Sequence, residues 1–158
     1  MHIHPVGTRA LLIELEDLSQ VMAWHAALDA QPLKDQVDAI AAATTLLLTF
    51  ATPNSAAAAA ERLQDFRPTA HAGEDPRLVE IDVLYDGEDL DEAAELMGLS
   101  REGLIDWHTS TEWLAAFGGF APGFTYCTPA DPAQNFDIER RATPRTAVPA
   151  GAVGIAGG

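Results

Sequence analysis

The chain has 158 residues, of which 47% are apolar, so it can bury a core as one domain or two small ones and is not disordered. Its net charge of −15 argues against binding to nucleic acids or to anionic membrane surfaces, because like charges repel. It has no apolar run long enough to span a membrane, no secretory pattern at the N-terminus and a single cysteine, which together predict a cytoplasmic protein without an internal disulfide.

The first half of the chain begins with a predicted strand and helix. Residues 9–15 alternate between apolar and other side chains, which is typical of a strand. Asp17 is placed to begin a helix whose apolar residues then recur at helical spacing. Residues 37–40 and 44–50 are rich in aliphatic and β-branched side chains and predict two further strands.

A second helix and a fourth strand complete this predicted unit. Thr52 followed by Pro53 is a typical helix start, and residues 79–85 alternate like a strand. The resulting β-α-β-β-α-β order is that of a ferredoxin-like split βαβ unit. We therefore expect an α+β protein with a ferredoxin-like domain at residues 1–78 and a second domain at residues 79–158.

The second half predicts short helices and then irregular structure. Asp89 with Glu92 is placed to cap one helix, and Gly98 suits its end. Ser100 is placed to cap the next helix, and residues 111–117 predict a strand. The remainder is rich in glycine and proline, which favours loops and short strands of a small barrel.

Two segments of this half carry candidate chemistry. His108 lies near the predicted end of a helix, where it is either a core or capping histidine favoured as a cation by the helix dipole, or a general acid or base. Residues 118–124 form a glycine- and proline-rich loop with two aromatic side chains. It is either a tight turn closed by an aromatic plug or a loop whose backbone N–H groups contact a ligand.

Three of the eight arginines, Arg140, Arg141 and Arg145, fall within six residues of one another. In an acidic protein such a cluster either forms structural ion pairs or binds a small anion. The glycine-rich residues that follow match neither a phosphate-binding loop nor a dinucleotide fingerprint, so any use of ATP requires a different pocket or another subunit.

Other site types find little support in the sequence. The five histidines have no cysteine partner and no H-E-x-x-H spacing, and the terminal pair His2 and His4 is weak support for a metal, so we expect no metal site. Cys127 stands outside any nucleophile motif and is expected to be a small buried apolar side chain.

Four segments carry patterns specific enough to suggest a family. Residues 85–90 with 100–110 resemble "YGGEDL" and "GLSEEEVIxLHTS", residues 119–126 resemble "GFAPGFxY", and residues 140–157 resemble "RRATPRTxVPAGSVGIAG". Residues 5–13 are similar to "PxGDRALLVE". These motifs, which extend over nearly the whole chain, resemble the family that includes KipI, the B subunit of 5-oxoprolinase (PxpB) and allophanate hydrolase subunit 1.

The resemblance implies both a fold and a function. It implies a cyclophilin-like β-barrel for the second domain and a B-type subunit of a heteromeric, ATP-dependent amide or lactam hydrolase. The implied partners are an A-type partner protein (KipA/PxpC-like, also called the C subunit of 5-oxoprolinase) and a LamB/YcsF-type protein. The implied substrate is a small carboxylate-bearing lactam or amide, namely 5-oxoproline, which is hydrolysed to glutamate, or allophanate.

The resemblance also suggests which residues line the cleft. His108 and Arg145 are the expected catalytic residues, with His108 moving a proton and an arginine pairing with the substrate carboxylate. Backbone N–H groups near Gly123 or Gly151 are expected to hold developing negative charge. The expected substrate-binding residues are Phe120, Pro122, Gly123, Phe124, Arg141, Pro149 and Gly151.

The sequence also departs from the family pattern. Ala152 replaces a usual serine, and Cys127 with Thr128 replaces a usual Leu-Gly. Family members continue beyond the position of Gly158, so we expect an incomplete barrel with open edges, which another chain can complete. The alternative functions are a KipI-like inhibitor that docks on a sensor histidine kinase through an exposed apolar patch, and an inactive scaffold.

Overall fold

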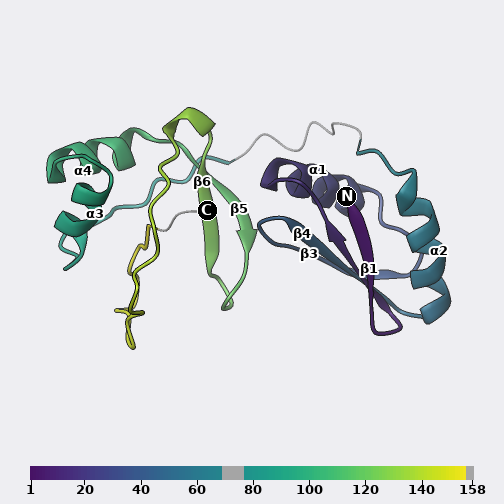
Figure 1. Ribbon diagram of the computed structural model, residues 1–158. Coiled ribbons are helices and arrows are strands. Elements are labelled where there is room, and N and C mark those ends of the chain that lie inside the picture. The colour runs from purple at the N-terminus through teal and green to yellow at the C-terminus, as the bar shows by residue number, and fades with distance from the viewer. Residues whose placement is uncertain (69–76, 156–158) are drawn as a thin grey trace. The chain divides into compact units, whose positions relative to one another are not determined.

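The computed structural model describes residues 1–68 and 77–155, and the chain divides into two compact units. The first unit comprises Met1–Leu78 together with Ala115–Cys127, and the second comprises Val79–Leu114 together with Thr128–Gly158. The mixture of helices and strands confirms the α+β class (Figure 1).

An antiparallel four-stranded sheet forms the centre of the first unit, with the strand order β1-β2-β4-β3. Its strands are β1 (His2–Val6), β2 (Ala10–Glu14), β3 (Gln36–Ala41) and β4 (Thr45–Phe50). The predicted strands at residues 9–15, 37–40 and 44–50 are confirmed, whereas the strand β1 was not predicted.

Two helices of the first unit begin where their capping residues predict. The Asp17 carboxylate accepts a hydrogen bond from the Gln20 backbone N–H at 2.8 Å and caps α1 (Leu18–Ala30). The Thr52 hydroxyl accepts from the Ser55 N–H at 3.1 Å and caps α2 (Pro53–Gln64). Each cap satisfies a backbone N–H that has no partner within the helix.

The core of the first unit lies between the sheet and these two helices. Leu11 and Ile13 of β2 are buried, as are Leu46 and Leu48 of β4. Because alternate residues of a strand point to one face, both helices must pack on that face. The helices contribute Val21, Trp24, Leu28, Ala56, Ala59 and Leu63 to the same cluster.

The predicted strand at residues 79–85 is wrong, because this segment has no paired strand in the structure. The place beside β2 is taken by β1, which reaches it through a short turn with the pairing Val6↔Ala10. Local pairing across a short loop costs less chain entropy than closing a long one. The apolar side chains of Val79, Ile81 and Leu84 are consequently 62%, 78% and 80% exposed.

The second unit contains two short helices. The Ser100 hydroxyl accepts from the Gly103 N–H and caps α4 (Arg101–Ser110), as predicted. Gly98, with φ +68°, follows α3 (Leu90–Leu96) in the left-handed region that glycine adopts at low cost. A small core of four buried side chains joins the helices to a later segment: Ala94, Met97, Leu104 and Ile138.

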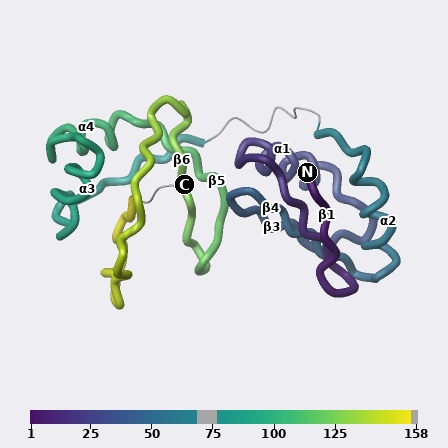
Figure 2. The backbone as a smooth tube through the Cα atoms, viewed as in Figure 1, coloured from purple at the N-terminus to yellow at the C-terminus, as the bar shows by residue number. Residues whose placement is uncertain are grey.

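The rest of the chain contains a two-stranded hairpin and irregular structure. The hairpin pairs β5 (Trp113–Gly118), close to the prediction, with β6 (Thr125–Pro129). After a single 3₁₀ turn at Pro132–Gln134, the tube follows an extended path (Figure 2). Within residues 77–155 there is no closed barrel, so the cyclophilin-like barrel stays a prediction.

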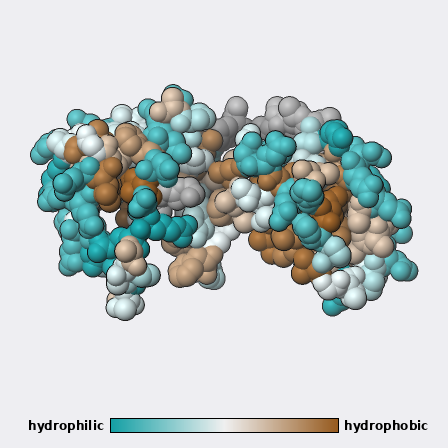
Figure 3. Space-filling model, in the orientation of Figure 1, coloured by the Kyte–Doolittle hydropathy of each residue, from teal (hydrophilic) through white to brown (hydrophobic). Residues whose placement is uncertain are grey.

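Hydrophilic residues are spread over the visible surface. In the space-filling view they surround α3, whereas α2 shows both hydrophilic and apolar residues (Figure 3). Among the described residues, no helix combines the length and the apolar character needed to cross a bilayer.

Candidate functional site

Arg141 and Arg145 converge on the carboxylate of Asp89, within the second unit. Arg145 Nε donates to one Asp89 oxygen at 2.9 Å and Nη2 donates to the other, which makes a bidentate fork. Arg141 Nη1 donates to Asp89 at 2.9 Å and also to Glu92 at 2.8 Å. Glu88 lies 3.1 Å from Arg145 and completes the group, which we call the guanidinium cluster.

The guanidinium cluster changes the role predicted for Asp89. Asp89 does precede α3, but its side chain makes no capping hydrogen bond. A carboxylate gains more from two guanidinium groups than from one backbone N–H, because both partners are then charged. The predicted capping contact of Asp89 is therefore wrong. The Asp89 carboxylate instead binds two arginines from a segment about fifty residues later in the chain.

The two arginines differ in how many donors they have already used. The fork to Asp89 occupies the Nε–Nη2 edge of Arg145. Arg141 uses only Nη1, and its Nε and Nη2 make no hydrogen bond within the described residues. Arg141 therefore keeps the edge of its guanidinium group that suits a second carboxylate.

The pKa of Asp89 predicts how the stability of the guanidinium cluster depends on pH. The hydrogen bond from Arg145, helped by the nearby positive charges, lowers the pKa of Asp89 below 3.8. In the folded state, the Asp89 carboxylate is therefore protonated only at a lower pH than in the unfolded state. The contribution of Asp89 to stability is complete above about pH 3.8 and is lost as the pH falls through the lowered pKa.

Asp89→Asn should remove this pH dependence. We expect the unfolding free energy of the unmodified chain to exceed that of the variant by a constant amount near neutral pH. Below about pH 3.8 the difference should shrink, with a slope of at most one proton. Urea unfolding across this pH range measures it. Asp106→Asn, at an exposed position without an ion pair in the described part of the chain, is the control; equal slopes for both variants would contradict the prediction.

His108 lies on the last turn of α4 and is hydrogen-bonded to a residue that the sequence did not single out. Its Nδ1 lies 2.6 Å from the Tyr85 hydroxyl, and the two rings are arranged edge to face. Trp107 and Trp113 contact the same imidazole, with ring centroids at 6.1 Å and 5.1 Å. The Trp113 indole N–H also donates to the His108 carbonyl at 3.0 Å, which fixes the end of the helix.

Burial decides the charge of this pair. It lowers the pKa of His108 below 6.5 and raises the pKa of Tyr85 above 10.0. The helix dipole favours a protonated histidine at this end of a helix, whereas desolvation, the cause of the lowered pKa, disfavours it. Contrary to the cationic interpretation, His108 is therefore favoured as a neutral imidazole and Tyr85 as a neutral phenol at pH 7.

The short segment at residues 85–89 connects the hydrogen-bonded pair Tyr85 and His108 to the guanidinium cluster. Tyr85 and Asp89 are four residues apart, so their Cα atoms lie within about 14 Å of each other. Tyr85 holds the histidine while Asp89 holds the arginines. The motif that carries residues 85–90 thus contacts two of the predicted site regions, and the sequence indicated it only through the family pattern.

The predicted loop at residues 118–124 belongs to the β5–β6 hairpin, in the part assigned to the first unit. The Phe124 N–H donates to the Ala121 carbonyl at 3.0 Å around Pro122 and Gly123, and Gly123 has φ +79°. Proline and then a positive-φ glycine at the two central positions are typical of a type II turn. The tight turn is therefore formed, but Phe120 is 91% exposed and does not act as a plug.

Pro149 and Gly151 form a similar turn in the second unit. The Ala152 N–H donates to the Pro149 carbonyl at 3.2 Å. Pro149, Gly151 and Ala152 are all exposed. The structure thus brings Arg141 and Arg145 together, and pairs His108 with Tyr85. The other predicted site residues lie in two exposed turns, one in each unit.

Two further side-chain predictions concern cysteine and metals. Cys127 is exposed, so its predicted burial is wrong: β6 is one strand of an isolated pair, and neither of its faces is covered at this residue. His4 lies 3.0 Å from Glu14 across the β1–β2 pair, where a salt bridge forms if the imidazole is protonated. Within the described ranges, no three His, Cys, Asp or Glu side chains are grouped as metal ligands.

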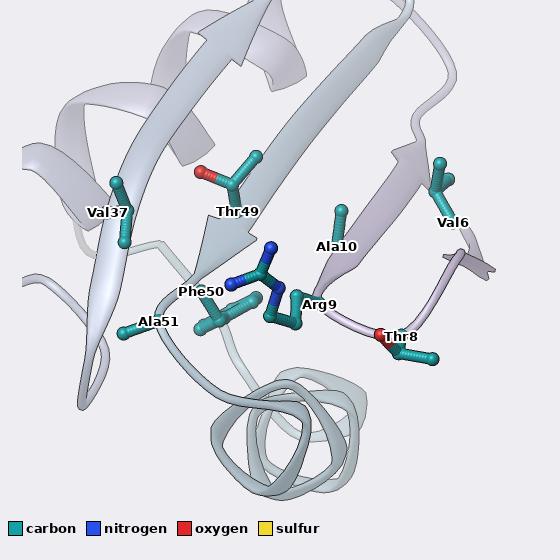
Figure 4. A pocket seen from close by; sticks show the side chains of 8 residues that line it. All are labelled: Val6, Thr8, Arg9, Ala10, Val37, Thr49, Phe50 and Ala51. Carbon is teal, nitrogen blue, oxygen red and sulfur yellow. The ribbon is translucent and has the colours of Figure 1, made fainter.

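One hollow of the first unit is lined by none of these groups. It is an open hollow of about 490 Å³ in the first unit, and Figure 4 shows the Arg9 side chain among its lining residues. Its other lining residues are apolar or carry hydroxyl groups: Val6, Thr8, Ala10, Val37, Thr49, Phe50 and Ala51. None of the predicted site residues lines it, so the geometry of the polar clusters, not this hollow, defines the candidate site.

Comparisons with known proteins agree on one family. The family model described as "Carboxyltransferase domain, subdomain C and D" matches residues 1–158. An Escherichia coli protein named as the B subunit of 5-oxoprolinase is 35% identical over 161 residues, covering 96% of this chain and 73% of that protein. A Bacillus subtilis protein of the same name is 44% identical over 84 residues, covering 51% of this chain and 34% of that protein.

The chain is also similar to a solved crystal structure. The crystal structure of TTHA0988 superposes with a TM-score of 0.69 at 31% sequence identity, over 94% of this chain. The chain spans only 31% of the length of TTHA0988.

Proposed function

The chain belongs to the family of carboxyltransferase domains, subdomains C and D, together with proteins named as B subunits of 5-oxoprolinase, and on that premise we propose that it is the B-type subunit of a heteromeric 5-oxoprolinase. The proposed complex also contains an A-type partner protein (KipA/PxpC-like) and a LamB/YcsF-type protein. It opens the lactam ring of 5-oxoproline to give glutamate, using ATP, in the cytoplasm. The chain is proposed to be inactive without these partners.

The observation that carries this proposal is the pair of guanidinium groups fixed on Asp89. 5-Oxoproline carries one carboxylate, and the unused edge of Arg141 offers two N–H donors to it. Arg145, whose corresponding edge is occupied by Asp89, is better suited to hold the cluster in place. We therefore assign substrate binding to Arg141 and positioning of Asp89 to Arg145.

The charge of the cluster also limits what it binds. Three carboxylates, those of Glu88, Asp89 and Glu92, surround the two guanidinium groups. The cluster therefore carries one net negative charge, which repels a triphosphate far more strongly than a substrate with a single carboxylate. We therefore propose that ATP binds on another subunit, and that this chain contributes to binding and orienting the lactam.

Reconstitution tests the proposed function directly. The 158-residue chain is mixed with its A-type and LamB/YcsF-type partners, and glutamate release from 5-oxoproline is measured with and without ATP. We expect release only when all proteins and ATP are present. An assembled complex that releases no glutamate, or that works equally well without this chain, overturns the proposal.

Arg141→Ala should weaken substrate binding in that complex. Losing a hydrogen-bonded pair to a charged group costs about 1.5–3 kcal/mol, so we expect KM for 5-oxoproline to rise by about 10- to 100-fold. Arg141→Lys should recover little, because an ammonium group lacks the planar fork. Arg140→Ala, next in the chain and exposed, is the matched control and should leave KM unchanged. An unchanged KM for Arg141→Ala removes this residue from the site.

The alternative function, a KipI-like inhibitor of a sensor histidine kinase, is favoured by a separate observation. The side chains of Val79, Ile81 and Leu84 are largely exposed along one extended segment, as a docking surface requires. Addition of the chain to a purified sensor kinase would then reduce its autophosphorylation. Inhibition without any 5-oxoproline-dependent turnover would favour this alternative.

A further inference from the structure

The contact between Tyr85 and His108 joins residues 23 positions apart in the sequence. The 2.6 Å separation of the Tyr85 oxygen and His108 Nδ1 is short for a neutral hydrogen bond, and the ring planes meet at 81° with centroids 5.8 Å apart. Trp113 and Trp107 contact the imidazole, and α4 carries it. The ring is therefore held on several sides.

The chemistry of the two groups decides which of them donates. A phenol O–H is a stronger acid than the N–H of a neutral imidazole, and an imidazole nitrogen is a stronger acceptor than a phenol oxygen. When both groups are neutral, the favoured arrangement is therefore O–H donating to Nδ1. Nδ1 then carries no proton, so the single proton of the neutral ring resides on Nε2.

We propose that Tyr85 is a positioning residue that holds His108 in the Nε2–H tautomer, so that His108 presents an N–H donor to an oxygen of the substrate. The part concerning substrate rests on the proposed function. Burial, which lowers the pKa of His108 and raises that of Tyr85, keeps both groups in the neutral forms that this arrangement requires.

This assignment changes the expected role of His108. A general base needs a free lone pair at the nitrogen that faces the substrate, whereas the Nε2–H tautomer offers a proton there. A neutral imidazole N–H can polarise a carbonyl oxygen and stabilise the negative charge that develops on it during attack. His108 therefore acts on the lactam carbonyl oxygen as a hydrogen-bond donor.

The tautomer of His108 can be determined without an enzymatic assay. In the chain labelled with ¹⁵N-histidine, long-range ¹H–¹⁵N spectra distinguish a protonated from an unprotonated ring nitrogen. We expect His108 to show a protonated Nε2 and an unprotonated Nδ1 near neutral pH. His25 provides an internal reference, because its Nε2 lies 3.1 Å from the Ala39 carbonyl, which can only accept.

Tyr85→Phe keeps the ring and removes only the hydroxyl group. We expect a larger fraction of His108 to carry its proton on Nδ1 in this variant, with no change at His25. In the reconstituted complex, kcat should fall by about threefold to tenfold at a similar KM, since one hydrogen bond is lost. An unchanged circular dichroism spectrum shows that the variant is folded.

The outcomes separate this inference from the proposed function. A protonated Nδ1 in the unmodified chain, or an unchanged tautomer in folded Tyr85→Phe, overturns the role of Tyr85. The expected tautomer in a complex that never releases glutamate leaves the positioning contact in place and refutes the hydrolase instead.

Discussion

His108→Ala is expected to lower kcat of the reconstituted complex by about 10²- to 10³-fold, the typical cost of losing one donor to a developing oxyanion. KM for 5-oxoproline should change little, because the proposed contact strengthens only as charge develops on the carbonyl oxygen. Steady-state kinetics of glutamate release measure both constants. The effect should exceed that of Tyr85→Phe, which removes only the group that orients the imidazole.

His108→Gln distinguishes a hydrogen-bond donor from a general base. Glutamine keeps an N–H group on a side chain of similar reach but cannot accept a proton near neutral pH. If His108 donates a hydrogen bond, His108→Gln should recover part of the lost kcat, whereas a required base would leave it as inactive as the alanine variant. His25→Gln, on α1 of the first unit, is the matched control. Full turnover by His108→Ala would exclude His108 from the reaction.

The first unit could be predicted largely from its sequence because its signals are local. Asp17 and Thr52 each cap the helix that follows them within three residues, and the contact needs no distant partner. Alternation in β2 and β4 is also a property of consecutive residues. These signals depend on short stretches of chain, so they are independent of how the rest of the protein folds.

The errors arise where two distant segments compete for one place or one partner. Residues 79–85 alternate like a strand, yet β1 occupies the edge of the sheet beside β2. Asp89 stands at a capping position, yet two arginines from residues 141 and 145 bind its carboxylate. Local propensity cannot rank such alternatives, because the energy difference is set by contacts that only the folded chain brings together.

The contacts of the candidate site could not be predicted from local sequence signals either. The family pattern directed attention to His108, Arg141 and Arg145, but not to the hydrogen bond from Tyr85 or to the shared carboxylate. The sequence did contain one signal for these ion pairs: Glu88 and Asp89 are adjacent acidic residues in one of the quoted motifs, and the arginines lie in another. Opposite charges in two motifs of one family are a reason to expect an ion pair between them.

Leu104→Ala is expected to unfold much of the second unit. Leu104 is 1% exposed and is the largest fully buried side chain of that unit's core. Leucine-to-alanine changes at such sites cost about 2–5 kcal/mol, through lost apolar burial and the cavity that remains. Among the described residues, four buried side chains form this core, against thirteen in the first unit, so little stability is available to absorb the loss.

Hydrogen exchange resolves this effect by unit. In Leu104→Ala, amide protection should fall by roughly 30-fold or more across α3 and α4, as about 2 kcal/mol implies, while the amides of β2 and β4 keep theirs. Leu96→Ala, at a position that is 60% exposed on α3, is the matched control and should change stability by no more than about 0.5 kcal/mol. Equal loss of protection in both units would mean that they unfold as one, because two separate cores should respond to their own residues.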